Sequence, residues 1–261
     1  MEQVLETIVA KSRKELAESR KRIPASLLES RIPELPPVRD FAAALRRPGR
    51  RVIAELKAAS PSKGAIRPEL DREVERLAAG LEAAGAAALS VLTERNFFLG
   101  SGMNLRRARG SVDIPLLRKD FIYDEYQILE ARVWGADAIL LIAAMLTPEE
   151  FRKLRAFAAS LGLAVLCEAH TADELDMLLD GGAEIVGINA RNLSTFETSL
   201  ALAGELIRQI PAGKIAVAES AIRSADDLNA MEQLGAKAFL IGETLMRAER
   251  PGEKLCELLS K

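Results

Sequence analysis

Short runs of almost continuously apolar residues recur along the chain, separated by longer stretches with helical periodicity. Apolar and polar residues do not alternate within these runs, which is typical of strands buried on both faces of a parallel sheet. Successive runs begin on average about 27 positions apart, which is the size of one βα unit. The eight predicted strands are 52–57, 88–94, 115–121, 138–144, 163–170, 184–189, 214–220 and 238–242.

The stretches between the predicted strands carry recognisable helix boundaries. Thr147, Thr171 and Ser224 each precede an acidic first turn, where their hydroxyl groups can accept hydrogen bonds from backbone N–H groups. Gly-Ala pairs stand just before predicted strands at positions 85, 135, 182 and 235. Glycine is typical of the position just past a helix end, because that position often needs a positive φ.

Eight strands alternating with helices over roughly 200 residues predict a closed (β/α)8 TIM barrel over residues 51–261. The alternative is an open doubly wound sheet, which the strand count and the lack of a GxGxxG motif after the first strand disfavour. Residues 1–50 fall outside this rhythm and predict an N-terminal helical extension of the same single domain. The extension either plugs one end of the barrel or covers an active site, and the pattern alone does not decide between them.

Composition excludes several classes of protein. The chain has 261 residues with 36 Lys+Arg against 38 Asp+Glu, and this net charge of −2, without a basic block, argues against a nucleic-acid-binding protein. Two cysteines, Cys167 and Cys256, are too few for a disulfide framework, so we expect a cytoplasmic location. The charged N-terminus does not resemble a signal peptide, and no apolar run approaches the ~20 residues of a membrane span.

Polar residues stand where the predicted strands end, which is where barrels of this kind place their active sites. Glu55 and Lys57 are two positions apart on the first strand, so they share a face. Lys119, Glu168 and Asn189 end three other strands. Charges inside a barrel are costly unless they are paired, so this set predicts one converging polar site more strongly than separate salt bridges.

Such a set suits general acid–base chemistry. A lysine beside carboxylates stays protonated and can act as an acid or bind an anion, while Glu168, flanked by Leu166 and Ala169, is expected to have a raised pKa and to act as a base. We interpret His170 as a structural residue at a strand end and Cys167 as a packing residue. One histidine and no CxxC or HExxH motif predict that there is no metal site.

Two further regions indicate an anionic substrate. The loop 58–68 mixes Ser, Pro, Lys, Gly and Arg, and we expect it to move about Gly64 and to close over an anion. Ser220 and Gly242 end the seventh and eighth strands, where many barrels bind a phosphate through backbone N–H groups. The sequence therefore predicts a phosphorylated small-molecule substrate.

These residues belong to motifs whose order resembles the indole-3-glycerol phosphate synthase family of tryptophan biosynthesis. The resemblance covers essentially the whole chain, including the N-terminal extension. The motifs are IAELK at 53–57, ASPSKG at 59–64, SVLTE at 90–94, FFLGS at 97–101, LRKDFI at 117–122, LCEAH at 166–170, GINARNL at 187–193, AES at 218–220 and FLIGETLM at 239–246.

The resemblance implies a lyase reaction that needs no cofactor. In this reaction 1-(2-carboxyphenylamino)-1-deoxyribulose 5-phosphate closes a ring and loses CO2 and water to give indole-3-glycerol phosphate. Lys119 would protonate the ribulose carbonyl oxygen, Glu168 would act as the base, and Lys57 would hold the substrate carboxylate or act as an acid in one step. The N-terminal extension would cover the mouth of the barrel.

The same resemblance implies roles for the remaining site residues. Glu55 and Glu219 would orient the lysines and the substrate hydroxyls, and Asn189 and Arg191 would fix the substrate and the loops around it. Phe98 and Phe121 would pack on the aromatic ring. The phosphate would be bound by Ser60, Ser220 and the backbone of Ala221, Gly242 and Glu243.

Two positions depart from the family pattern. Ala221 replaces the glycine usual after the serine of the seventh strand, so we expect weaker phosphate binding if this residue has a positive φ. Cys167 replaces a small aliphatic residue, which should not disturb packing.

Two other functions stay open at this point. A phosphoribosylanthranilate isomerase would need an early catalytic cysteine, which the first strand lacks. A non-catalytic phosphosugar-binding barrel should have lost Lys119 or Glu168, and this chain keeps both. A monomer and a homodimer are equally compatible with the sequence.

Overall fold

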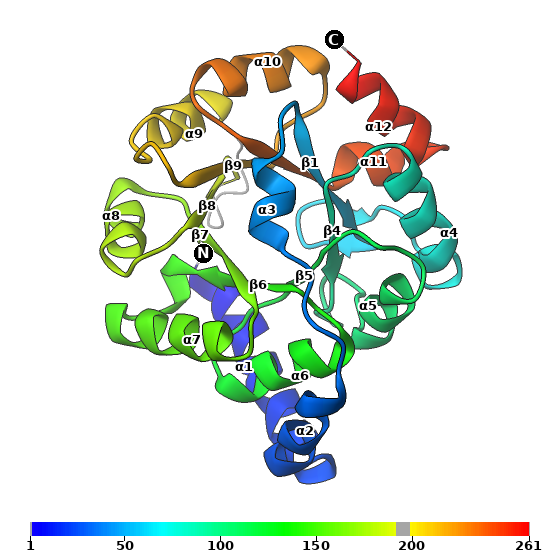
Figure 1. Ribbon diagram of the computed structural model, residues 1–261, viewed down its shortest axis with the longest axis vertical. Helices are drawn as coiled ribbons and strands as arrows, with labels where there is room; N and C mark the ends of the chain where they lie inside the picture. Colours follow the sequence, from blue (N-terminus) through cyan, green and yellow to red (C-terminus); the bar gives the residue numbers. More distant parts are fainter. Residues whose placement is uncertain (1, 192–198, 261) are drawn as a thin grey trace.

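The computed structural model, which describes residues 2–191 and 199–260, shows a closed barrel of parallel strands surrounded by helices (Figure 1). The strand order is β1-β10-β9-β8-β7-β6-β5-β4, and the barrel closes because β1 pairs with both β10 and β4. The predicted (β/α)8 barrel is confirmed, and the open doubly wound sheet is excluded. The barrel strands are β1 (Arg51–Leu56), β4 (Ala88–Leu92), β5 (Leu116–Lys119), β6 (Ala138–Ile142), β7 (Ala164–Ala169), β8 (Ile185–Asn189), β9 (Ile215–Glu219) and β10 (Ala238–Ile241).

Helices follow the strands around the outside of the barrel. They are α4 (Leu70–Ala83), α5 (Gly102–Arg109), α6 (Glu125–Trp134), α7 (Pro148–Ser160), α8 (Ala172–Asp180), α9 (Leu200–Ile207), α10 (Ala225–Gln233), α11 (Glu243–Arg247) and α12 (Pro251–Leu259), with a 3-10 turn η2 (Ala143–Met145). The loop after β1 contains a short hairpin of β2 (Ala59–Ser60) and β3 (Gly64–Ala65). Within the described ranges, no helix has both the length and the apolar content to cross a membrane.

The helix boundaries have the predicted chemistry. The Thr147 hydroxyl accepts the backbone N–H of Glu150, whose carboxylate accepts the backbone N–H of Thr147 at 2.8 Å. Ser224 begins α10 with the same reciprocal pair of hydrogen bonds. At the other end, Gly135 closes α6 with a left-handed φ of 91°, which glycine adopts without steric cost.

Alternation along each strand divides its side chains between two cores. On β1, Val52, Ala54 and Leu56 pack toward the surrounding helices, whereas Ile53 packs inside the barrel. Glu55 lies two residues after Ile53 and therefore shares its inward face. The apolar alternation thus directs a charged side chain into the carboxyl end of the barrel.

The N-terminal extension closes the amino end of the barrel with α3 (Phe41–Arg46), which lies across the barrel opening in Figure 1. Phe41 and Leu45 are each 1% exposed and belong to the interior cluster. Ala88 and Ala138, the first residues of β4 and β6, belong to the same cluster. These contacts fit the plugging role that the sequence left open.

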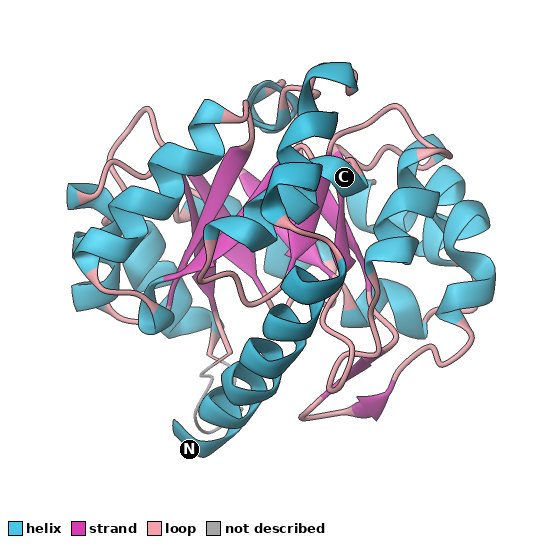
Figure 2. Cartoon of the chain, turned by 90° about the horizontal axis from the view of Figure 1, so that it is seen from below, coloured by secondary structure: helices cyan, strands magenta, loops and turns pink. Residues whose placement is uncertain are grey.

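The helix α1 (Glu2–Arg22) covers the opposite, carboxyl end. Its N-terminal end lies at the same end of the barrel as the β2–β3 hairpin (Figure 2). Ser12 hydrogen-bonds the hydroxyl of Tyr123 at 3.1 Å, and Arg20 pairs with Asp124 in the loop after β5. The helix α2 (Ala25–Arg31) then packs on α6, followed by the turn η1 (Ile32–Glu34). The extension therefore both covers and plugs the barrel, because different helices serve the two ends.

We expect Phe41→Ala to lower the free energy of unfolding by about 3–5 kcal/mol, because the substitution leaves a cavity where α3 fills the barrel. Urea titration followed by circular dichroism measures this change. Leu202→Ala is the matched control, since Leu202 is 64% exposed and its loss should change stability by less than about 0.5 kcal/mol. Equal effects of both substitutions would contradict the plugging role of α3.

Candidate active site

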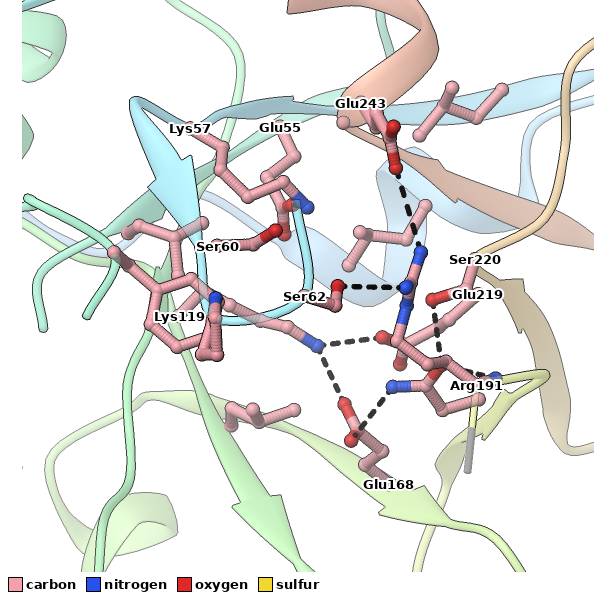
Figure 3. Close-up of a pocket in the computed structure, with 18 of the residues that line it drawn as sticks. Glu55, Lys57, Ser60, Ser62, Lys119, Glu168, Arg191, Glu219, Ser220 and Glu243 are labelled. Atoms are coloured by element: carbon pink, nitrogen blue, oxygen red, sulfur yellow. Dashed lines mark hydrogen bonds and ion pairs between the residues drawn. The ribbon is translucent and has the colours of Figure 1, made fainter. Parts of the chain in front are cut away.

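The carboxyl end of the barrel holds a cavity of about 410 Å³, part of whose lining is labelled in Figure 3. Every residue predicted for the site lines this cavity. The strands bring these residues together because their carboxyl ends meet at one end of the barrel. The predicted residues in the lining are Glu55, Lys57, Ser60, Phe98, Lys119, Phe121, Glu168, Asn189, Arg191, Glu219, Ser220, Ala221, Gly242 and Glu243.

Lys119, the last residue of β5, reaches between two buried carboxylates (Figure 3). Its Nζ lies 2.6 Å from Glu168 Oε2 and 2.6 Å from Glu219 Oε2. We call these three residues the Lys119 cluster. Burial alone would lower the pKa of Lys119, but the two carboxylates outweigh burial and raise that pKa above its usual value. Lys119 is therefore a charged ammonium inside the barrel.

The prediction of a raised pKa for Glu168 is wrong. The pKa of this carboxyl group lies well below its usual value. Burial does raise the pKa, as the apolar neighbours in sequence suggested. The ammonium of Lys119 and a contact with His170 outweigh burial and stabilise the ionised carboxylate. Asn189 Nδ2 also donates a hydrogen bond to Glu168 Oε1 at 3.1 Å. Glu168 is thus an ionised carboxylate with donors on both oxygens.

The raised carboxyl pKa belongs to Glu219. Burial is the largest cause, and the negative charge of Glu168 adds to it, which together outweigh the ammonium of Lys119. Glu219 Oε1 has no hydrogen-bond partner among the described residues. A Cβ on Gly187 would lie 2.1 Å from this oxygen, so β8 needs glycine there to leave room for the carboxylate. Within the cluster, Glu219 is the carboxyl that holds a proton most readily.

Lys57 forms a second, separate ion pair. Its Nζ lies 2.6 Å from Glu55 Oε1, and Ser90 Oγ donates to Glu55 Oε2 at 3.4 Å. A Cβ on Gly242 would lie 2.4 Å from Glu55 Oε1, so this glycine also makes room for a carboxylate. The cavity therefore contains two ammonium groups, one paired with Glu55 and the other with Glu168 and Glu219.

The chain turns sharply where β9 ends, at the place predicted for a phosphate. Ser220 and Ala221 have left-handed φ values of 63° and 59°, so the condition set for a cost at Ala221 is met. Ser220 Oγ donates to Asn189 Oδ1 at 2.7 Å, which joins this turn to the end of β8. Thr244 Oγ1 donates to the carbonyl oxygen of Ile222 at 2.6 Å and joins the turn to α11.

Phe98 and Phe121 form an aromatic wall, with ring centroids 6.0 Å apart and ring planes tilted by 47°. The buried carboxylate of Glu94 shapes this wall by accepting the backbone N–H groups of Phe97 at 2.7 Å and Phe98 at 3.0 Å. The carbonyl oxygen of Phe98 accepts the N–H of Ala59, so the wall also holds the β2–β3 hairpin. Phe98 and Phe121 were predicted for the site, whereas the carboxylate of Glu94 that orients this wall was not among the predicted residues.

Arg191 connects three segments around the mouth (Figure 3). Its Nη1 donates to Ser62 Oγ in the β2–β3 hairpin at 2.9 Å, and its Nη2 lies 3.5 Å from Glu243 Oε2. Its backbone N–H donates to Asn189 Oδ1 at 3.0 Å. This geometry agrees with the predicted role in fixing the loops.

Several cavity residues were absent from the prediction. Leu5 and Ile8 of α1 line the cavity. Their spacing of three positions places them on one face of an otherwise charged helix, and this pattern could have predicted that the face packs against the barrel. Ser62 and Arg223 also line it, and both follow predicted strand ends. In the described part of the chain, no group of three or more His, Cys, Asp or Glu side chains could hold a metal ion. Cys167 is buried between the barrel and its helices, as the packing interpretation predicted.

We expect Glu219→Gln to gain stability relative to the wild type as pH rises from about 5 to about 8. A carboxyl whose pKa is raised by folding binds its proton more tightly in the native state, so the wild type loses stability through this interval and the amide does not. Urea titrations of both proteins across this range measure the difference. A difference that stays constant with pH would contradict the raised pKa.

Solved structures share the fold at low sequence identity. A structure of KGPDC from Streptococcus mutans has a TM-score of 0.62 and 17% identity, covering 80% of this chain and 95% of that chain. A mutant tryptophan synthase alpha-subunit from Pyrococcus furiosus has a TM-score of 0.61 and 17% identity, covering 80% of this chain and 97% of that chain. These likenesses support the barrel fold.

Sequence relatives identify the family. The family model described as indole-3-glycerol phosphate synthase matches residues 5–258. A protein of that name from Dechloromonas aromatica is 44% identical over 266 residues and is covered completely, as is this chain. Another of that name from Chromobacterium violaceum is 46% identical, covering 99% of this chain and 98% of the relative. The chain belongs to the indole-3-glycerol phosphate synthase family.

Proposed function

We propose that the chain performs the reaction of this family in the described cavity, with Lys119 as the general acid and Glu168 as the general base. Family membership assigns a carboxy-lyase of tryptophan biosynthesis. The substrate is 1-(2-carboxyphenylamino)-1-deoxyribulose 5-phosphate, and the products are indole-3-glycerol phosphate, CO2 and water. The observation that carries the proposal is the buried Lys119 ammonium, held 2.6 Å from both Glu168 and Glu219.

Lys119 supplies the proton for ring closure. The ring carbon that bears the carboxylate attacks the ribulose carbonyl carbon, and the carbonyl oxygen gains negative charge as the new C–C bond forms. A buried ammonium stabilises that oxygen and donates a proton to it. The C–CO2 bond then breaks, and its electron pair restores the aromatic ring.

Glu168 removes a proton from the new ring during dehydration, while the C–O bond breaks and Lys119 protonates the leaving hydroxyl group to give water. Glu219, 2.6 Å from Lys119 Nζ, returns a proton to this lysine between the two steps. The low pKa of Glu168 keeps it ionised in the free protein. Once Lys119 has given up its proton, the main charge that lowers this pKa is gone, so Glu168 becomes a stronger base at the step that needs one. Glu219 holds Lys119 from the other side and orients the substrate hydroxyl groups.

Lys57 binds the substrate carboxylate until it leaves as neutral CO2. The lysine is paired with Glu55 at 2.6 Å and its side chain is partly exposed to the cavity, so it can meet an incoming anion. Phe98 and Phe121 pack against the aromatic ring of the substrate. This arrangement places the carboxylate away from the Lys119 cluster.

The phosphate binds at the ends of β9 and β10. We assign it to Ser60, Ser220 and the backbone of Ala221, Gly242 and Glu243, while Asn189 and Arg191 hold the surrounding loops. Neither alternative function has a supporting observation, because β1 has no cysteine and the cavity keeps both Lys119 and Glu168. We infer a cytoplasmic location from the biosynthetic family and from two free cysteines. A monomer and a homodimer both stay predictions.

We expect Lys119→Ala and Glu168→Gln each to lower kcat by at least about 100-fold, because each removes a proton-transfer group. Purified protein is mixed with the substrate in the presence of a chelator, and product formation is followed by indole fluorescence. Circular dichroism confirms that each variant is folded.

The outcomes of this assay separate the possibilities. No turnover by folded wild-type protein would contradict the enzyme and favour a phosphosugar-binding barrel. Turnover that survives Lys119→Ala would move the role of acid to Lys57. Turnover that requires metal, and is lost in chelator, would contradict the cofactor-free reaction.

We expect Ala221→Gly to lower KM severalfold while kcat stays within about twofold. Alanine at a φ of 59° costs roughly 1 kcal/mol and can displace a backbone N–H that binds phosphate, and glycine removes this strain. Steady-state kinetics measure both constants. Ala248→Gly is the matched control, because Ala248 has a φ of −69° and should show no gain. An unchanged KM in Ala221→Gly would contradict a cost at this position.

A further inference from the structure

His170 faces two carboxylates, one inside the site and one outside it. Its Nε2 lies 3.4 Å from Glu168 Oε1, and its Nδ1 lies 3.4 Å from Glu174 Oε2. The side chain is only 9% exposed. Among the described residues, Glu168 on β7 and Glu174 on α8 are the charged groups that face this ring.

Glu174 is fixed in its place by the start of α8. Its carboxylate accepts the backbone N–H of His170 at 2.7 Å, and its own N–H donates to Thr171 Oγ1 at 3.2 Å. The side chain of Glu174 is 22% exposed, so it connects the buried ring with the solvent. The local structure therefore holds a carboxylate against the side of His170 that faces away from Glu168.

The two carboxylates at 3.4 Å favour a charged imidazole through their charge, since neither contact has hydrogen-bond geometry. A neutral ring has one donor and one acceptor nitrogen, and an ionised carboxylate only accepts, so a neutral His170 would direct a lone pair at one of the two carboxylates. Burial opposes the charge, as does the positive end of α8. The two carboxylates outweigh burial and raise the pKa of His170 to about 9.

We propose that His170, held by Glu174, is a positioning residue that orients Glu168 and keeps it ionised until the substrate offers its proton. The proposal rests on the proposed function, in which Glu168 is the base. His170 and Asn189 hold Oε1 of Glu168, while Oε2 faces Lys119. Oε2 is therefore the oxygen that takes the proton from the substrate.

The arrangement matters most after Lys119 has given up its proton. At that point the nearest positive charge is lost from Glu168 Oε2, and a carboxylate held only by Lys119 would be free to turn. The imidazolium and the Asn189 amide still hold Oε1, so the carboxylate keeps its direction. The charge on His170 also stops Glu168 from taking a proton from water before the substrate offers one.

The first test is an NMR titration of His170, which is unambiguous because the chain has 1 histidine. Tag-free protein with a labelled imidazole ring is titrated as wild type, Glu174→Gln and Glu168→Gln. We expect the wild-type ring to titrate near pH 9, as the contacts imply, and each amide variant to titrate about 1 unit lower or more. A wild-type ring that titrates near pH 6.5, or one that does not respond to Glu168→Gln, would overturn the proposal.

The second test is the pH dependence of kcat/KM. His170→Gln keeps an amide donor and removes the charge, so the acidic limb should move to higher pH by about 1 unit or more while KM changes little. In Glu174→Gln the ring is still charged at low pH, so the acidic limb should stay in place and kcat should fall above the lowered pKa of His170. A purely structural role of the histidine would lower activity without moving either limb.

A matched control separates these effects from the loss of a helix cap. Glu150 occupies the same position at the start of α7, where its carboxylate accepts the N–H of the N-cap residue Thr147 at 2.8 Å with no histidine involved. Glu150→Gln should leave both the titration of His170 and the pH profile unchanged.

The outcomes distinguish this proposal from the proposed function. If the wild type shows no turnover, the function fails, and the NMR titration still decides whether the Glu168–His170–Glu174 contacts hold. If the wild type is active and Glu168→Gln is inactive, a pH profile of His170→Gln that coincides with the wild type overturns the positioning role alone. Should His170→Gln fail to fold, Glu174→Gln carries both measurements.

Discussion

The site depends on keeping Lys119 charged although its side chain is only 13% exposed. An ammonium buried in this way is costly unless opposite charges and hydrogen bonds replace its hydration. Glu168 and Glu219 both lie 2.6 Å from Lys119 Nζ and provide that replacement. Two ionised carboxylates beside one ammonium would leave a net negative charge. The raised pKa of Glu219 reduces that charge because this carboxyl group tends to keep its proton.

This charge balance determines which residues neighbouring strands can carry. A side chain at Gly187 would collide with the Glu219 carboxylate, and one at Gly242 would collide with Glu55. The interior of the barrel is apolar around Ile53 and changes to paired charges at Glu55, which is the next inward-facing residue of β1. Glycine occurs in β8 and directly after β10 because the carboxylates occupy the space that a Cβ would take.

The sequence predicted the positions of the site much better than its protonation. Strand-end residues could be placed because alternation and parallel pairing determine where a side chain goes, and all of the predicted residues do line the cavity. The pKa of Glu168 could not be read in the same way. Leu166 and Ala169 are its apolar neighbours along the chain, but Lys119 reaches it from another strand and His170 from two positions further on, and these two contacts decide its charge. The extension was ambiguous for a similar reason, since its pattern does not say which end of the barrel each helix meets.

The two lysines differ in the feature that separates an acid from an anion-binding group. Lys57 has one carboxylate partner, Glu55, so that pair is already neutral and can accept a substrate carboxylate as a third member. Lys119 lies between two carboxylates whose proton affinities differ and respond to its own charge. Loss of its proton therefore raises the basicity of Glu168 directly. A group that must donate a proton and later recover one is better placed between such carboxylates than in an isolated ion pair, which supports our proposal that Lys119 transfers protons and Lys57 binds the substrate carboxylate.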